Sequence, residues 1–299
     1  MVDTHGFDRE KLQNTLAGAE LRQDILDLIA RPAEGKPWHE YRQIFLDSAR
    51  IDRGVDFWNS NAKSLEVAAD RYGVPPEIIV AILGVETRYG GYKGRHRVLD
   101  ALATLAFAYP KRSTFFTKEL EQFLLLTREE GMDPAEPIGS YAGAMGTPQF
   151  MPSSFRSYAV DFDGDGKRDI WSDAKDTVGS VANYFQRHGW RRGEPIVAAA
   201  QVDGDLYQRV VNKGRKPQMN LADLKAAGVK IDKHWDDGLP ATLMELDGVE
   251  GPEHWVGLYN FYVITRYNHS VLYALAVYQL SQEIAAERQR RASLLGQAN

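Results

Sequence analysis

The stretch "PPEIIVAILGVETRYGG", residues 75–91, decides how the fold of this chain is interpreted. Ile78, Ile82 and Glu86 are spaced four residues apart, so in a helix their side chains lie on one face. The other residues of the run are mostly aliphatic, which indicates that this face is buried. The pattern therefore predicts a helix with a carboxylate where a further aliphatic residue would be expected.

Two interpretations of Glu86 are compatible with this pattern. The first is a structural ion pair with Arg88 or Arg95, which follow closely in the sequence. The second is a general acid, because apolar surroundings disfavour the charged carboxylate and keep a proton available near neutral pH. The glycines of "ETRYGGYKG" end the helix directly after Glu86, which suits a side chain at the edge of a cleft.

The composition excludes several classes of protein. The 299 residues are 43% hydrophobic and 26% charged, as in ordinary globular proteins, and the net charge of −5 argues against nucleic acid as a partner. The absence of cysteine excludes disulfides, thiolate metal sites and cysteine nucleophiles. Apolar runs are far shorter than the roughly 18 residues of a membrane span, so we expect no transmembrane segment. The opening "MVDTHGFDREKLQ" lacks the apolar core of a signal peptide.

Helical patterns dominate the chain, with one β-rich exception. We expect helices at 8–18, 20–29, around 38–47, at 54–72, 75–89, 99–108, 114–130, 176–189 and from 270 onward, with a charged, frayed tail at 288–299. Residues 197–260 instead carry short alternating runs separated by Asp-Gly turns, with one helix near 221–227. The predicted fold class is mostly α (α+β), with a small antiparallel β insertion.

The stretch "DFDGDGKRDIWSD", which begins at Asp161, has the ligand spacing of an EF-hand calcium loop. Oxygen ligands at positions 1, 3, 5, 7 and 9 are predicted to be Asp161, Asp163, Asp165, the Lys167 backbone carbonyl and Asp169. Position 12 is Ser172 rather than a bidentate Glu, so Asp173 or Asp176 must close the loop. The alternative is a turn crowded with aspartates, but such close carboxylates repel one another without a cation. We expect a structural Ca²⁺ here.

Four blocks of sequence together resemble one known family. They are "GVETRYG", "GSYAGAMGTPQFMPSSFRSYAVDFDGDG", "GSVANYFQRHGW" and "NFYVITRYNHS", and they occur in an order that is similar to the lytic murein transglycosylase B family. The resemblance implies a lysozyme-like helical core. It also implies cleavage of the β-1,4 bond between N-acetylmuramic acid and N-acetylglucosamine in peptidoglycan, leaving a 1,6-anhydromuramic end. Glu86 would then be the single acid and base, and the muramic C6 hydroxyl the nucleophile.

The resemblance also implies a set of substrate-binding residues. These are Ser140, Gln149, Tyr184, Tyr267, Asn268, Tyr273, Arg112, Lys111 and Tyr41. Glycan strands of peptidoglycan would be the main partner, with other cell-wall enzymes as further partners. No organic cofactor is implied. From the family alone we expect a periplasmic protein, soluble or anchored to the outer membrane by lipid in its full-length form.

Two alternative functions and a set of domain boundaries complete the predictions. A hydrolytic muramidase would use water in place of the C6 hydroxyl, and an inactive scaffold would only bind the cell wall. The predicted segments are an N-terminal helical domain at 1–67, a catalytic core at 68–196, the β insertion at 197–260 and a helical segment returning to the core at 261–299.

Overall fold

The computed structural model describes residues 1–30 and 35–297. Its contacts divide the chain into two compact units. Unit 1 contains Met1–Glu34 and Glu86–Asn183, and unit 2 contains Gly35–Val85 and Tyr184–Asn299. Each unit is therefore built from two separate segments of the chain. The four-segment division 1–67, 68–196, 197–260 and 261–299 stays a prediction.

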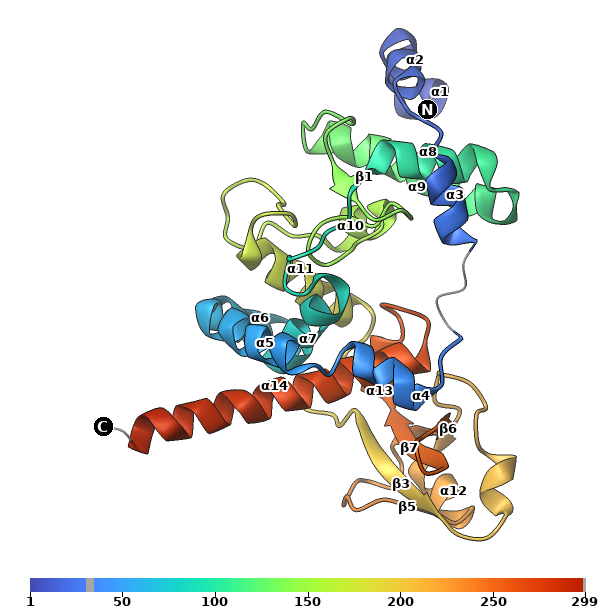
Figure 1. The fold of residues 1–299 in the computed structure, drawn as a ribbon, viewed down its shortest axis with the longest axis vertical. Coiled ribbons are helices and arrows are strands. Elements are labelled where there is room, and N and C mark those ends of the chain that lie inside the picture. The colour runs from blue at the N-terminus through green and yellow to red at the C-terminus, as the bar shows by residue number, and fades with distance from the viewer. Residues whose placement is uncertain (31–34, 298–299) are drawn as a thin grey trace. The chain divides into compact units, whose positions relative to one another are not determined.

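Unit 1 is organised around two helices, α8 (Val98–Ala108) and α9 (Ser113–Glu129), which pack against each other (Figure 1). Large aromatic side chains fill its core, and Phe116, Phe123 and Phe155 are almost fully buried. Its other elements are α1 (Val2–His5), α2 (Arg9–Ala17), α3 (Gln23–Ile29), the 3-10 helix η2 (Pro110–Arg112), α10 (Pro152–Tyr158) and the paired strands β1 (His96–Arg97) and β2 (Ile138–Gly139).

Two helices run across the boundaries of unit 1 in the sequence. Helix α7 (Pro76–Thr87) reaches unit 1 with its last two residues, and α11 (Ala174–Arg187) begins in unit 1. The predicted helix 75–89 is thus confirmed except at its C-terminal end. It stops at Thr87 because Arg88 and Tyr89 adopt left-handed backbone conformations, with φ of 51° and 61°.

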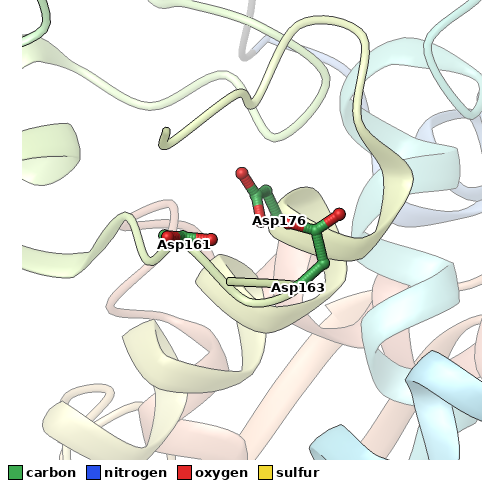
Figure 2. A group of neighbouring side chains, drawn as sticks. All are labelled: Asp161, Asp163 and Asp176. Carbon is green, nitrogen blue, oxygen red and sulfur yellow. The ribbon is translucent and has the colours of Figure 1, made fainter. Parts of the chain in front are cut away.

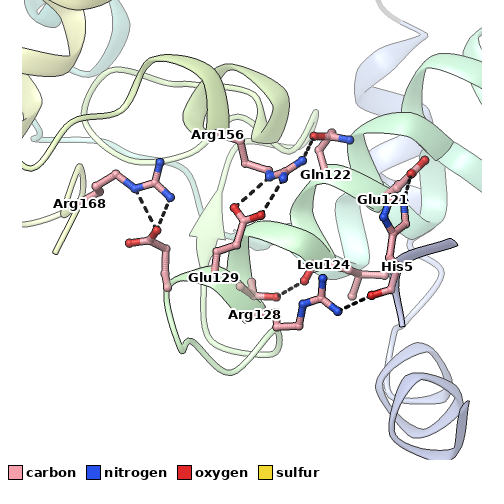
Figure 3. A network of polar contacts seen from close by, with 10 residues as sticks. His5, Glu121, Gln122, Leu124, Arg128, Glu129, Arg156 and Arg168 are labelled. Atoms are coloured by element: carbon pink, nitrogen blue, oxygen red, sulfur yellow. Dashed lines mark hydrogen bonds and ion pairs between the residues drawn. The ribbon is translucent and has the colours of Figure 1, made fainter. Parts of the chain in front are cut away.

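A network of polar contacts joins α9 to α10 and to the N-terminus (Figure 3). The Arg156 guanidinium donates to both carboxylate oxygens of Glu129, at 3.0 and 2.6 Å. This hydrogen bonding lowers the pKa of Glu129. Arg128 donates to the backbone carbonyl of His5 at 2.7 Å, and the His5 ring lies 2.6 Å from Glu121. Hydrogen bonds therefore fasten the first residues of the chain to the rest of unit 1.

The helical part of unit 2 contains a long C-terminal helix, α14 (Val271–Gln297), which packs on α5 (Ser48–Ser60). The tail was expected to be frayed, but it continues α14, since Arg291 pairs with Asp52 and Asp56 of α5; residues 298–299 lie outside the described residues. The predicted helix 54–72 is two helices, because Asn61 breaks it between α5 and α6 (Ala62–Tyr72). The remaining helices are α4 (Trp38–Tyr41), η1 (Arg42–Ile44) and α13 (Tyr259–Ile264).

The β-rich part of unit 2 is a five-stranded antiparallel sheet with strand order β4-β6-β7-β3-β5 (Figure 1). Leu221, Leu224, Leu243, Val256 and Leu258 form its buried core. The elements are β3 (Val197–Val202), η3 (Leu206–Arg209), β4 (Met219–Asn220), α12 (Leu221–Ala226), β5 (Val229–Lys230), β6 (Pro240–Asp247) and β7 (Pro252–Leu258). The predicted fold class, mostly helical with a small antiparallel insertion, is confirmed. Among residues 1–30 and 35–297, no helix combines the length and apolar character needed to cross a membrane.

Candidate active site

Glu86 lies in the last turn of α7, where the chain turns sharply. Its side chain is half-buried, and the next residue, Thr87, is only 2% exposed. Beyond the helix end, Arg88, Tyr89 and Gly90 all have positive φ values. Two consecutive non-glycine residues in this region store backbone strain, of the order of 1–2 kcal/mol each. Strain of this kind is typical of a segment that places a functional side chain.

Ser140 opens the loop that follows β2, and its backbone and side chain both hold that loop in shape. Its N–H donates to the Ala144 carbonyl at 2.8 Å. Its Oγ accepts from the N–H groups of Ala142 and Ala144, at 3.2 and 3.1 Å. Because both hydroxyl lone pairs are used, Ser140 retains its own O–H as a donor.

Gln149 lies at the far end of the same loop and has a left-handed backbone, with φ of 52°. Its side-chain Nε2 donates to the carbonyls of Gly146 and Lys93, at 2.9 and 3.3 Å. The amide nitrogen is therefore occupied, and the side-chain oxygen is the part of Gln149 that can accept a bond from a ligand.

One pocket of ≈ 290 Å³ is lined by Glu86, Ser140 and Gln149 together. The structure thus brings Glu86 together with two residues of a loop much later in the sequence, all within unit 1. The pocket is also lined by Arg95, which the sequence offered as an ion-pair partner of Glu86, and by residues that the sequence did not single out, namely Leu28, Tyr92, Gly94, His96 and Tyr141.

The sequence could have indicated some of these additional residues, but not Leu28. Tyr141 is the neighbour of Ser140, and Tyr92 and His96 follow shortly after Glu86, so the motifs could have indicated them. Leu28 comes from α3, and only the packing of the chain reveals it. Burial lowers the pKa of His96, which therefore contributes a neutral ring to the pocket near pH 7.

A larger hollow of ≈ 640 Å³ lies elsewhere in unit 1, beside Trp171. Its lining includes Arg168 and Glu130, which already form an ion pair with each other. Volume alone would favour this hollow over the pocket at Glu86. We favour the smaller pocket, since it combines a half-buried acid at a strained helix end with two hydrogen-bonding side chains.

Lys111 and Arg112 are exposed in η2, away from the lining of the Glu86 pocket. They line a separate hollow of ≈ 400 Å³ in unit 1. The Arg112 guanidinium lies 4.5 Å from the centre of the Phe115 ring, in a cation–π contact. Contact of these two cations with substrate stays a prediction.

The five remaining predicted binding residues belong to unit 2. Tyr184 is 7% exposed, and its hydroxyl donates to the Arg266 carbonyl at 2.6 Å. Its ring lies 4.8 Å from that of Tyr267. Tyr273 is 3% exposed, Asn268 is exposed, and Tyr41 contacts Phe45 at 5.3 Å between ring centres. Their place beside a substrate at Glu86 also stays a prediction.

Carboxylates gather at the loop that begins at Asp161 (Figure 2). Oxygens of Asp161, Asp163 and Asp176 lie within 4.8 Å of one another. Asp161 accepts from three backbone N–H groups of its own loop, at 2.7 to 3.1 Å. Asp176, in the first turn of α11, accepts from the N–H groups of Phe162 and Asp169. The loop is thus wrapped around three carboxylates.

The other predicted ligands of this loop are used differently. Asp169 accepts from the backbone of Trp171 and Ser172, and Asp165 accepts from the N–H of Lys167. Asp161, Asp163 and Asp176 therefore converge, while the carboxylates of Asp165 and Asp169 are not part of this group, and the Lys167 carbonyl stays a predicted ligand.

The electrostatics of the cluster fit a hard cation. Burial raises the pKa of Asp176, which is only 1% exposed and lies among like charges. A hydrogen bond from Lys175 lowers the pKa of Asp163. Carboxylate oxygens converging on one point are the donor set that Ca²⁺ prefers, and a divalent cation would offset their repulsion.

Comparisons with known proteins cover nearly the whole chain. A family model described as the transglycosylase SLT domain matches residues 1–282. Membrane-bound lytic murein transglycosylase B of Escherichia coli (strain K12) is 46% identical over 300 residues, covering 96% of this chain and 81% of the relative.

Solved structures extend the similarity to the fold. Soluble lytic transglycosylase SltB1 from Pseudomonas aeruginosa is 54% identical, with a TM-score of 0.92 and 97% of each chain covered. Escherichia coli lytic transglycosylase Slt35 in complex with calcium is 45% identical, with a TM-score of 0.87 and 96% and 91% covered. Pseudomonas aeruginosa SltB3 in complex with NAG-anhNAM-pentapeptide is 31% identical, with a TM-score of 0.83 and 94% and 75% covered. The predicted lysozyme-like fold is thereby confirmed, and this chain belongs to the transglycosylase SLT domain family, among the lytic murein transglycosylases of type B.

Proposed function

We propose that this protein is a peptidoglycan lytic transglycosylase in which Glu86 is the single acid and base. The observation that carries the proposal is the pocket shared by Glu86, Ser140 and Gln149, in a chain 46% identical to a lytic murein transglycosylase B. The half-buried position of Glu86 at a helix end suits an acid that must hold a proton and still reach a substrate.

The reaction can be written so that no water is consumed. Glu86 donates its proton to the glycosidic oxygen between N-acetylmuramic acid and N-acetylglucosamine, and the C1–O bond breaks. The resulting carboxylate takes the proton of the muramic C6 hydroxyl as that oxygen bonds to C1. The products are a free N-acetylglucosamine hydroxyl and a 1,6-anhydromuramic end. An intramolecular hydroxyl is favoured by proximity, so a second carboxylate is not needed. The relative SltB3 was solved with a ligand of the anhydro class, NAG-anhNAM-pentapeptide, which supports this assignment.

The roles of the two supporting residues follow from their hydrogen bonds. Ser140 keeps one O–H donor, so we assign it to the acetamido carbonyl of the sugar or to the Glu86 carboxylate. Gln149 keeps its amide oxygen, so we assign it as an acceptor for a sugar hydroxyl or N–H. We also propose that the glycan strand contacts the remaining predicted binding residues, which are Tyr184, Tyr267, Asn268, Tyr273, Tyr41, Lys111 and Arg112.

We further propose that Asp161, Asp163 and Asp176 hold a structural Ca²⁺, supported by the calcium complex of the relative Slt35. Bound there, the ion would supply charge neutralisation that lets the loop keep its fold. The EF-hand character of the loop, with Asp165, Lys167 and Asp169 as further ligands, belongs to the same proposal. We place the protein in the periplasm, soluble or lipid-anchored, with peptidoglycan strands and other cell-wall enzymes as partners.

The decisive experiment is mass spectrometry of purified peptidoglycan after digestion. A lytic transglycosylase releases anhydro-muropeptides, which are lighter by one water than the products of a hydrolytic muramidase. The Glu86→Gln variant should release neither, with a loss of at least about 10²-fold in turnover, while still binding glycan, because amide and carboxyl have nearly the same shape. Hydrated products would favour the muramidase. Full turnover by the Glu86→Gln variant would show that Glu86 is not the catalytic acid. A wild-type protein that binds sacculi but releases no muropeptides would favour the inactive cell-wall-binding scaffold.

A further inference from the structure

Thr87 follows Glu86 directly, and its hydroxyl joins two parts of unit 1. The hydroxyl donates to the backbone carbonyl of Thr147 at 2.8 Å. It also accepts from the N–H of Gly90 at 2.9 Å. The first bond reaches the loop that carries Gln149, and the second closes the turn that ends α7. One hydroxyl thus connects the end of the helix that carries Glu86 to the loop that carries Gln149.

This attachment matters because the helix ends in a strained turn. The last carbonyls of a helix have no partner within the helix, so terminal turns fray easily. Here the following residues, Arg88 and Tyr89, are also held at positive φ, a conformation that costs energy and persists only when its surroundings impose it. Glu86 is one residue from this strained end, so any relaxation of the turn would displace its carboxyl group.

Burial makes the hydroxyl difficult to replace. Thr87 is 2% exposed and Thr147 is 7% exposed, so water has little access to either group. Without the hydroxyl, the Thr147 carbonyl and the Gly90 N–H would both lose a partner, and buried polar groups then seek new partners by local rearrangement.

We propose that Thr87 is a positioning residue for the reaction: its hydroxyl sets the distance between the Glu86 carboxyl and the Gln149 loop. The inference rests on the proposed function, because it assigns Thr87 a role through Glu86. Thr87 does not contact the glycan in this proposal. Its loss should therefore reduce the rate of bond cleavage much more than the affinity for the strand.

The test compares two substitutions at this position with a matched control. Thr87→Val keeps the shape and removes the hydroxyl, whereas Thr87→Ser keeps the hydroxyl. The control is Thr127→Val, which also removes a buried hydroxyl bonded to a backbone carbonyl, that of Leu124 in α9. Release of soluble anhydro-muropeptides gives kcat and KM, thermal unfolding gives Tm, and sedimentation with sacculi reports binding.

We expect kcat of Thr87→Val to fall about tenfold to a hundredfold, the scale of a misplacement of about 1 Å, with KM and sacculus binding nearly unchanged. Thr87→Ser should retain most of the wild-type kcat. Thr127→Val should lower Tm without lowering kcat. If Thr87→Val does not fold, Thr87→Ala against Thr87→Ser makes the same comparison.

The inference is overturned if folded Thr87→Val keeps the wild-type kcat, or if Thr87→Ser is as slow as Thr87→Val. It is also overturned if Thr127→Val loses as much kcat as Thr87→Val, since the effect would then be one of general stability. Glu86→Gln separates these outcomes from failure of the proposed function. An active Glu86→Gln protein would refute the acid itself, whatever the Thr87 variants do.

Discussion

The N–H of Thr147 donates to the backbone carbonyl of Ile170 at 2.8 Å. Thr147 belongs to the loop that carries Gln149, and Ile170 belongs to the segment between Asp163 and Asp176. The backbone of Thr147 is thus held at both polar groups, its N–H by the Ile170 carbonyl and its C=O by the Thr87 hydroxyl. The acidic loop and the helix end at Glu86 are therefore linked through one residue, and this link guides several of the predictions.

Gly146→Ala should break this link. Gly146 has φ of 67°, and a Cβ added there would lie 2.6 Å from the carbonyl oxygen of Ile170. The left-handed backbone costs about 1–2 kcal/mol for a side chain, and the contact with Ile170 adds to it. We expect a destabilisation of about 3 kcal/mol in denaturant unfolding, together with a loss of activity larger than the unfolded fraction explains.

Gly131→Ala is the matched control for this substitution. Gly131 has nearly the same φ, 66°, but a Cβ there meets nothing within 4 Å. Gly131→Ala should lower the free energy of unfolding by only about 1 kcal/mol, the cost of a side chain on a left-handed backbone. It should leave the activity of the folded protein unchanged. Equal destabilisation by the two substitutions would show that the contact with Ile170 is unimportant.

Calcium should stabilise the protein through the carboxylate cluster. At a free concentration of about 100 times Kd, binding to the folded state alone adds about 2.7 kcal/mol to the free energy of unfolding. Titration calorimetry and thermal unfolding with Ca²⁺ or a chelator measure this directly. Hydrogen exchange at the Thr147 amide should also slow when calcium binds, because its acceptor Ile170 lies in the same loop.

Two aspartates test which carboxylates hold the ion. Asp163→Asn removes a member of the cluster and should weaken Ca²⁺ binding at least about tenfold, since affinity follows the number of charged ligands. Asp165→Asn changes a carboxylate outside the cluster and should have the smaller effect. The reverse order would favour the EF-hand spacing read from the sequence over the cluster seen in the structure.

Gln149→Gly should separate stability from activity. The substitution relieves a left-handed glutamine, worth about 1 kcal/mol, and removes two side-chain hydrogen bonds of about 1 kcal/mol each, so the net destabilisation is about 1 kcal/mol and Tm should fall by only a few degrees. Turnover should fall about tenfold or more, because the amide oxygen in the pocket is lost.

Asn212→Gly is the corresponding control in unit 2. Asn212 also has positive φ, 53°, and its side chain also accepts a backbone hydrogen bond, from Glu245. Its substitution should leave turnover at the wild-type level. A wild-type turnover for Gln149→Gly would exclude Gln149 from the binding site.

Acid stability should depend on Glu129. Hydrogen bonding from Arg156 lowers the pKa of Glu129 below its ordinary value of 4.5, so the folded state binds its proton less readily than the unfolded state. The stabilisation is fully present above pH 4.5 and is lost as the pH falls through the lowered pKa. Glu129→Gln should cost about 0.5 kcal/mol near neutral pH, the scale of a partly exposed ion pair.

Thermal unfolding across this pH range gives the check. The Tm difference between Glu129→Gln and the wild type should shrink as the pH is lowered below 4.5. Glu136→Gln is the comparison, since Glu136 is exposed and forms no ion pair with any residue in the described ranges. A Tm difference for Glu129→Gln that is independent of pH would contradict the assignment.

The sequence predicted helices and strands correctly where the residue pattern of a single segment is enough to define them. The aliphatic run before Glu86 predicted α7, and the Asp-Gly turns predicted the antiparallel sheet of residues 197–260. The errors fell at boundaries. Asn61 interrupts a helical pattern that continues on both sides of it, and α14 extends through a charged tail because Arg291 finds partners on α5. Neither cause is visible from periodicity.

By itself, the sequence determined the helix that carries Glu86, the acidic loop at Asp161, the fold class and, through four blocks, the family. Only the tertiary structure decided that Leu28 joins Glu86, Ser140 and Gln149 in one pocket, that Asp176 rather than Asp165 completes the carboxylate cluster, and that the Thr87 hydroxyl bonds to Thr147. The physical reason is the same in each case. Side-chain type and spacing act within a segment, whereas these contacts depend on chain packing and on backbone carbonyls and N–H groups, which nearly every residue has and no motif records.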